Sequence, residues 1–173
     1  MAQQILATLP ADYPIPVVLI THLPPDSDRA MLGVFQSVSR LPVKQAMDKA
    51  TIAAGCIYLA PPNYHLLVET NGHFALSIDP PIKAVRPSID VFLKSAAEAY
   101  ENHLIAVILS GANSDGADGM SYVKTLGGVT IVLNPLQAEF RIMPDAVIET
   151  TDVDYIADLD EIISLLLAVQ DQP

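Results

Sequence analysis

Short apolar runs rich in β-branched residues alternate along the chain with longer amphipathic stretches. This alternation is typical of βα units, in which helices cover buried parallel strands. It predicts strands over residues 16–20, 43–46, 56–60, 104–110 and 129–133, with a short strand near Tyr155. It predicts helices over residues 28–39, 87–100, 116–126 and 159–169. The predicted fold class is therefore α/β, doubly wound, with a mostly parallel sheet and helices on both faces.

Two segments depart from this regular alternation. Residues 65–78 contain two alternating runs around Asn71-Gly72, a pair that favours the tight turn of an antiparallel β-hairpin. Residues 1–9 indicate the end of a helix with no strand before it. We therefore expect residues 1–173 to form a single domain that is truncated at its N-terminal strand.

Composition narrows the function classes. Nine Lys and Arg against 20 Asp and Glu give a formal charge of -11, which would repel a nucleic-acid backbone. The longest apolar stretches, 104–109 and 162–169, are far shorter than a membrane helix requires, so we expect no membrane insertion. Cys56 is the single cysteine and no secretion signal opens the chain, which favours a cytoplasmic location.

His22 directly follows the first predicted strand. Ligands of open α/β sheets bind at the carboxyl ends of strands, where a histidine can serve as a general base. A hydrogen-bonded structural histidine explains the position equally well. Both interpretations stay open on position alone.

The loop after the apolar run 104–109 is rich in glycine and ends at Asp115, next to a predicted helix. Asp115 could be a simple N-cap, or it could fix the tautomer of a catalytic histidine. The spacing fits neither a calcium loop nor a dinucleotide or phosphate-binding motif. We expect no cofactor and no metal.

Arg86 stands just before the helix that Ser88 and Asp90 would cap. A cation gains nothing from a helix N-terminus, so Arg86 hints at binding. The remaining histidines, His65, His73 and His103, are expected at the surface, without zinc-site spacing.

Five ordered motifs together resemble the methylesterase domain of the CheB family across nearly the whole chain. They are T-H-L-P-P at 21–25, G-C-I-Y-L-A-P at 55–61, R-P-S-I-D at 86–90, L-S-G at 109–111 with S-D-G at 114–116, and M-P at 143–144.

The resemblance implies a Ser-His-Asp protein-glutamate methylesterase that hydrolyses methyl esters on chemoreceptors in chemotaxis signalling. His22 would be the base and Asp115 its orienter. Arg86 and Ser88 would bind substrate, and the backbone at Ala112 and Asn113 would help to form an oxyanion site.

The chain also departs from the family pattern. The strand and Gly-x-Ser-x-Gly-like turn that carry the serine are missing, as is the receiver domain found upstream in many members. Ser27 and Ser114 lack the strand-to-helix turn that exposes a nucleophile. Ala112 replaces a common methionine, and residues 137–142 replace a run of small residues.

Three hypotheses stay open. The chain is the truncated domain of a methylesterase, or a catalytically inactive binding module in chemotaxis signalling, or, on fold analogy alone, a nucleotide-binding protein. Truncation would expose a strand edge and favour a homo-oligomer.

Overall fold

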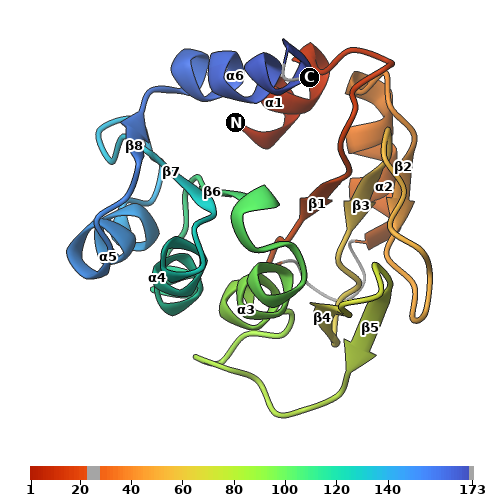
Figure 1. The fold of residues 1–173 in the computed structure, drawn as a ribbon, viewed down its shortest axis with the longest axis horizontal. Coiled ribbons are helices and arrows are strands. Elements are labelled where there is room, and N and C mark those ends of the chain that lie inside the picture. The colour runs from red at the N-terminus through yellow and green to blue at the C-terminus, as the bar shows by residue number, and fades with distance from the viewer. Residues whose placement is uncertain (23–27, 172–173) are drawn as a thin grey trace.

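The parallel strands pair into two three-stranded sheets (Figure 1). The structure, a computed structural model, describes residues 1–22 and 28–171. One sheet has the order β1-β3-β2, and the other has the order β6-β7-β8. Their bounds are β1 (Val17–Leu19), β2 (Val43–Gln45), β3 (Ile57–Leu59), β6 (Ile105–Ile108), β7 (Val129–Leu133) and β8 (Tyr155–Ala157). The predicted mostly parallel pairing is confirmed, with β1 and β6 at the neighbouring edges of the two sheets.

The predicted hairpin is present as a separate two-stranded antiparallel sheet. β4 (His65–Val68) pairs with β5 (Phe74–Ser77). The turn between them places Gly72 at a φ of 79°. In this left-handed region glycine carries no steric cost, which explains the Asn-Gly signal.

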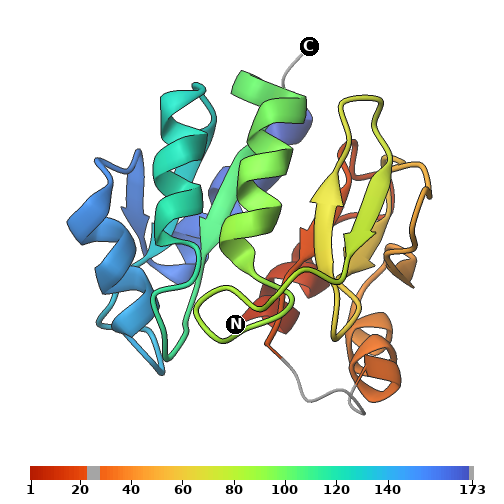
Figure 2. The same ribbon diagram turned by 90° about the horizontal axis from the view of Figure 1, so that it is seen from below.

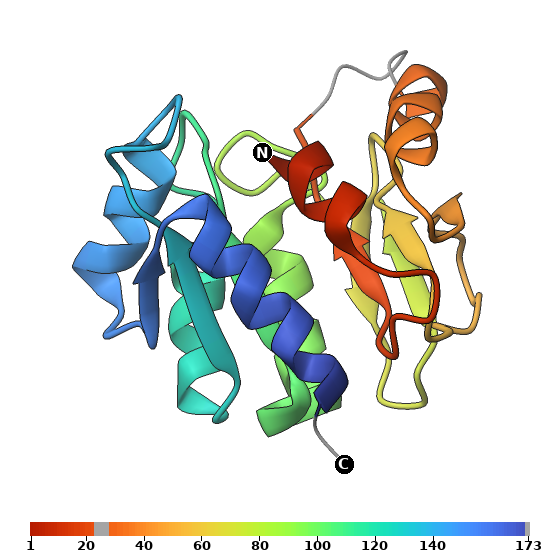
Figure 3. The ribbon, with the colours of Figure 1, turned by 90° about the horizontal axis from the view of Figure 1, so that it is seen from above.

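Helices cover both faces of the sheets, as predicted (Figures 2 and 3). The helices α3, α4 and α5 lie on one face, and α1 and α6 lie on the opposite face. The helices are α1 (Ala2–Thr8), α2 (Asp28–Val38), α3 (Ile89–Tyr100), α4 (Ala117–Thr125), α5 (Ile142–Thr150) and α6 (Leu159–Leu167), with short 3-10 turns η2 (Glu101–His103) and η3 (Ala168–Asp171).

Strand β3 shows how one strand serves two cores. Successive side chains of a strand point to opposite faces. Tyr58 therefore packs in the cluster that includes Phe92 and Leu93 of α3, whereas Ile57 and Leu59 pack in the cluster of α1 and α2. All three β3 side chains are buried, which explains the continuous apolar run in the sequence.

Helix α5 is the element that the sequence pattern did not predict. It contains Pro144, which normally interrupts a helix. Pro144 is the third residue of α5, however, and the first turn of a helix has no intrahelical acceptor for its N–H groups. Proline is therefore tolerated there.

Helix α6 begins with a complete capping box. The Asp158 side chain accepts from the backbone N–H of Glu161, and the Glu161 carboxylate accepts from the backbone N–H of Asp158 at 2.9 Å. These bonds satisfy helix N–H groups that have no partner within the helix. Across residues 1–22 and 28–171, no helix combines the length and the apolar character needed to cross a membrane.

Candidate active site

His22 and Asp115 meet although they are 93 residues apart in the sequence. His22 follows β1, and Asp115 lies in the loop between β6 and α4. The His22 Nε2 atom is 3.0 Å from Asp115 Oδ2. The two neighbouring sheets therefore bring a histidine and a carboxylate together at the carboxyl ends of their first strands.

Asp115 is a buried carboxylate with a full set of hydrogen-bond donors. Its side chain is 0% exposed. Oδ1 accepts from the Ser88 hydroxyl at 2.7 Å and from the Asp90 N–H at 3.2 Å. Oδ2 accepts from the Ile89 N–H at 2.6 Å as well as contacting His22. Asp115 therefore caps the start of α3 and not, as the simple N-cap interpretation supposed, the start of α4.

These donors keep Asp115 ionised. Burial raises the pKa of the Asp115 carboxyl, but the hydrogen bonds from His22, the Ile89 N–H, Ser88 and the Asp90 N–H outweigh burial and bring the pKa below its ordinary value. An ionised carboxylate can only accept hydrogen bonds. His22 Nε2 must therefore carry the hydrogen, which leaves Nδ1 of the neutral ring as the basic nitrogen.

The turn after Asp115 depends on a glycine. Gly116 has a φ of 99°, a region that other residues rarely adopt. A Cβ atom at Gly116 would lie 2.9 Å from side-chain atoms of both Ile108 and Ile89. The Asn113 Oδ1 atom accepts from the Asp115 N–H at 3.0 Å and closes the preceding turn.

The segment 111–113 borders the same edge. The N–H of Gly111 donates to the carbonyl of Phe140, and its carbonyl accepts from the Met143 N–H. Neither the Ala112 N–H nor the Asn113 N–H donates a hydrogen bond to another described residue. Ala112 is exposed and Asn113 half-buried. Two backbone donors are therefore available near the histidine–aspartate pair.

Arg86 and Ser88 occupy different environments. Arg86 is half-buried, and its Nη1 donates to the carbonyls of Ile78 and Asp79 at 2.8 and 3.0 Å. Its Nε atom is buried without a partner in the described part of the chain. Ser88 is fully buried, and its hydroxyl donates a hydrogen bond to Asp115. Ser88 therefore helps to hold Asp115 in place. Its predicted role as N-cap of α3 is confirmed.

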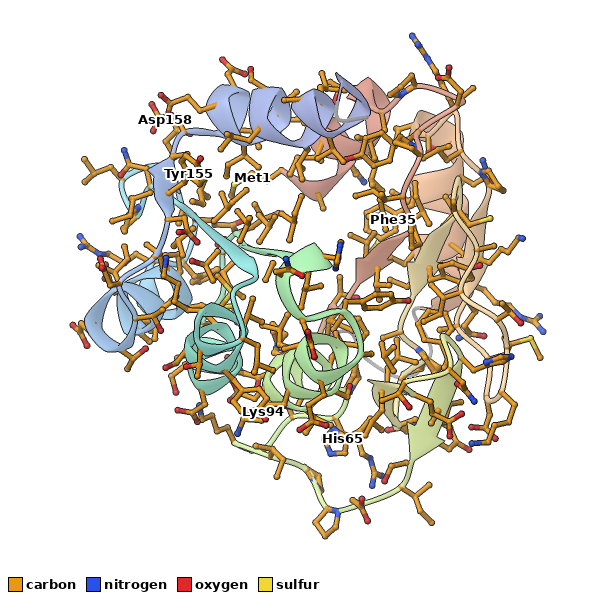
Figure 4. The ribbon with its side chains drawn as sticks, in the orientation of Figure 1. Met1, Phe35, His65, Lys94, Tyr155 and Asp158 are labelled. Carbon is orange, nitrogen blue, oxygen red and sulfur yellow. The ribbon has the colours of Figure 1, made fainter. Side chains whose placement is uncertain are left out.

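Three further residues support the site: His65 and Lys83 had no sequence signal, and Asp90, expected to cap its own helix, accepts instead from N–H groups at the start of α4. His65 was expected at the surface but is 1% exposed, and its Nδ1 accepts from the Ser88 N–H at 3.2 Å (Figure 4). The Nε2–H of His65 donates to the Pro80 carbonyl. Asp90 is also buried, and Lys83 binds it. The possible nucleophile Ser27 lies outside the described residues.

A histidine held by a buried carboxylate at the carboxyl ends of parallel strands is the arrangement that hydrolases use to activate a nucleophile. Fold and site thus define the class: an α/β protein with a histidine–aspartate pair of the hydrolase type.

Comparison with known proteins identifies the family. The family model described as CheB methylesterase matches residues 1–166. A putative protein-glutamate methylesterase/protein-glutamine glutaminase of Leptospira interrogans is 44% identical over 163 residues, which cover 94% of this chain and 84% of that relative. The crystal structure of the Thermotoga maritima CheB methylesterase catalytic domain matches with a TM-score of 0.93 at 34% identity, over 97% of this chain and 90% of that one. The chain belongs to the CheB methylesterase family.

Some relatives are longer. The Clostridium acetobutylicum protein-glutamate methylesterase/protein-glutamine glutaminase is 31% identical over 166 residues, which cover 96% of this chain and 48% of the relative. The chain therefore spans about half the length of that protein.

Proposed function

We propose that the chain is the catalytic-type domain of a protein-glutamate methylesterase that hydrolyses glutamate methyl esters on chemoreceptors by a Ser-His-Asp mechanism. The observation that carries the proposal is the 3.0 Å contact between His22 and the buried Asp115. The names of the relatives supply the substrate class. Those names also include a protein-glutamine glutaminase. Deamidation of glutamine, like hydrolysis of a glutamate methyl ester, replaces the group on the side-chain carbonyl carbon.

His22 acts as the general base. Its Nδ1 takes the proton of a serine hydroxyl as that oxygen attacks the ester carbonyl, and it later returns a proton to the departing methoxide. Asp115 stays ionised, because its pKa lies below the ordinary value, and it stabilises the imidazolium that forms. Water then hydrolyses the acyl-enzyme to the free glutamate.

The oxyanion is stabilised by the free backbone N–H groups of Ala112 and Asn113. Each such donor is commonly worth about 3 kcal/mol of activation free energy. Gly111 and Met143 hold the base of this loop through backbone hydrogen bonds. Arg86 lies in the substrate cleft and helps to bind the substrate.

The serine is supplied by a strand that lies between β1 and β6. Among residues 1–22 and 28–171, each of these strands pairs with one neighbour, β3 and β7 respectively, so the edges that β1 and β6 turn toward each other are unpaired there. A parallel strand placed there would end at the edge that carries His22 and Asp115. These unpaired edges could also pair with a second copy of the chain.

The chemoreceptor docks at the loops around this edge, on the cytoplasmic side of the membrane. The loop before α5 and the first residue of that helix expose three large apolar side chains, Leu136, Phe140 and Ile142. Phe140 contacts Ser110 and Gly111 through hydrogen bonds. Exposed apolar side chains next to a site are typical of protein-binding surfaces.

Methanol release from methylated receptors tests the proposal. The protein purified from its source cells is incubated with receptor membranes that carry radiolabelled methyl esters, and volatile methanol is counted. We expect His22→Gln to lower the rate at least about 1,000-fold, as loss of a triad member does. His103→Gln, at an exposed turn, is the matched control and should leave the rate unchanged.

Two outcomes would contradict the proposal. Unchanged methanol release after His22→Gln would remove the histidine from the mechanism. Receptor capture without any methanol release by the wild-type protein would favour the inactive binding module.

A further inference from the structure

The Asp115 carboxylate caps α3, the helix that contains Asp90, and the Asp90 carboxylate caps α4, the helix that follows Asp115. Asp115 accepts from the N–H groups of Ile89 and Asp90 at the start of α3. Asp90 Oδ1 in turn accepts from the N–H groups of Gly116 and Gly119 at the start of α4, at 2.9 and 2.8 Å. Each carboxylate is thus held by the helix that begins beside the other, so the position of one fixes the position of the other.

This arrangement buries two carboxylates in the paired caps of α3 and α4. The Asp90 side chain is 3% exposed and the Asp115 side chain 0% exposed. Like charges at short range disfavour ionisation unless each has a partner of opposite charge or enough donors. His22 contacts Asp115, and Lys83 binds Asp90.

Lys83 uses all three of its N–H donors on this cluster. Its Nζ atom lies 2.8 Å from Asp90 Oδ2, 3.0 Å from Asp118 Oδ2 and 3.1 Å from the Ser114 carbonyl oxygen. A lysine ammonium has three donors, so its geometry is fully specified here. The Ser114 contact also ties Lys83 to the residue that directly precedes Asp115.

We propose that Lys83, acting through Asp90, is a positioning residue that fixes the Asp115 carboxylate and thereby the His22 ring. Its role in catalysis rests on the proposed function, but the geometry of the cluster does not. Lys83 compensates the Asp90 charge, so that Asp115 keeps its hydrogen bonds at the start of α3 and its contact with His22. Without Lys83, the charge of the Asp90 carboxylate is uncompensated. Its repulsion of Asp115 then weakens the hydrogen bonds that position both carboxylates.

Nuclear magnetic resonance of the 173-residue chain tests this without any hydrolysis assay. The Asp115 carboxyl carbon is titrated, and the hydrogen-bonded ring N–H of His22 is observed, in wild type and in Lys83→Met. We expect the substitution to raise the pKa of Asp115 by about one unit and to speed the exchange of the His22 ring proton. Lys49→Met, which breaks an exposed ion pair with Glu69, is the control and should change neither signal.

A second variant separates charge compensation from a general structural effect. In the double variant Lys83→Met/Asp90→Asn, the amide oxygen still accepts from Gly116 and Gly119, but position 90 carries no charge. We expect the pKa of Asp115 to return to within about half a unit of wild type, because the repelling charge is gone. A pKa that stays as high as in Lys83→Met would overturn the proposal.

Two further results would also decide against it. If Lys83→Met folds and leaves both signals unchanged, Lys83 positions nothing. If Lys83→Met does not fold, Lys83→Arg and the double variant carry the test. A pKa of Asp115 raised in either of them would then refute the role. Methanol release has no part in these measurements, so failure of the proposed function is recognised separately.

Discussion

Replacing Asp115 with asparagine should lower the free energy of unfolding by about 3 kcal/mol at pH 7. The amide has the size of the carboxylate, so the change tests hydrogen bonding and charge rather than packing. Both carboxylate oxygens of Asp115 accept two hydrogen bonds each. Asparagine must place an NH₂ group at one of these two positions.

Either orientation leaves a backbone N–H without an acceptor. An NH₂ group at the Oδ1 position can donate to the Ser88 hydroxyl but faces the Asp90 N–H. At the Oδ2 position it can donate to His22 but faces the Ile89 N–H. An unsatisfied buried donor costs about 2 kcal/mol, and loss of the negative charge at the N-terminus of α3 costs about 1 kcal/mol more.

Urea unfolding followed by circular dichroism measures the difference in free energy of unfolding between wild type and Asp115→Asn. The direction in which this difference changes with pH follows from the pKa of Asp115. The folded-state pKa of Asp115 lies below the ordinary value. The ionised carboxylate therefore contributes stability that is fully present above the unfolded-state pKa of about 3.9 and is lost as the pH falls through the folded-state pKa. Asparagine does not titrate, so the gap between the two proteins should narrow below about pH 4.

Asp145→Asn serves as the control. This carboxylate pairs with Arg141 on the surface of α5, so the variant should lose much less stability than Asp115→Asn. An Asp115→Asn protein as stable as wild type at pH 7 would refute the capping role. A gap that widens on acidification would refute the linkage argument.

Four further predictions concern packing, helix propensity and the histidine tautomer. Gly119→Ala should destabilise the chain by about 2 kcal/mol in thermal melts, because its Cβ would lie 2.8 Å from the Leu93 Cβ. A Cβ atom at Gly33 would have nothing within 4 Å, so Gly33→Ala should stabilise α2 by up to about 1 kcal/mol. Equal effects of Gly119→Ala and Gly33→Ala would contradict the close packing of Gly119 against Leu93. Phe74→Ala should cost about 4 kcal/mol in urea unfolding, since this ring is 0% exposed, and a loss below about 1 kcal/mol would contradict its core position. Nitrogen-15 spectra of neutral His22 should show hydrogen on Nε2 and a free Nδ1, and the opposite tautomer would exclude the Asp115 hydrogen bond described above.

Local patterns predicted most of the fold. Residues 129–133 were predicted as a strand and form β7 with the same bounds, because every position is apolar or β-branched and four of the five are buried. Helix α5 was not predicted, since the sequence gives no indication that Pro144 falls in a first turn, where proline is tolerated. The separation into two sheets could not be predicted either, because the pairing partners of β1 and β6 are set by tertiary structure.

Only part of the candidate site could be predicted from the sequence, because some of its contacts are set by tertiary structure. His22 and Asp115 were noticed because each follows an apolar strand, and parallel strands carry such residues to one edge. Lys83 and His65 gave no such signal. Lys83 reaches Ser114 and Asp118 across 31 and 35 residues, and His65 reaches Ser88 across 23. The Lys83 contacts depend on the position of its loop beside α4, and the His65 contact depends on the packing of β4 against the start of α3. No local pattern encodes either arrangement.

Covalent labelling with a fluorophosphonate tests whether His22 activates a serine nucleophile. The reagent reacts with a serine that a histidine activates, and mass spectrometry of the protein from its source cells locates the adduct. We predict one adduct, on a serine of a strand that lies between β1 and β6, with labelling abolished by His22→Gln. The absence of an adduct, or labelling of Ser110 or Ser114 that persists in His22→Gln, would contradict the account.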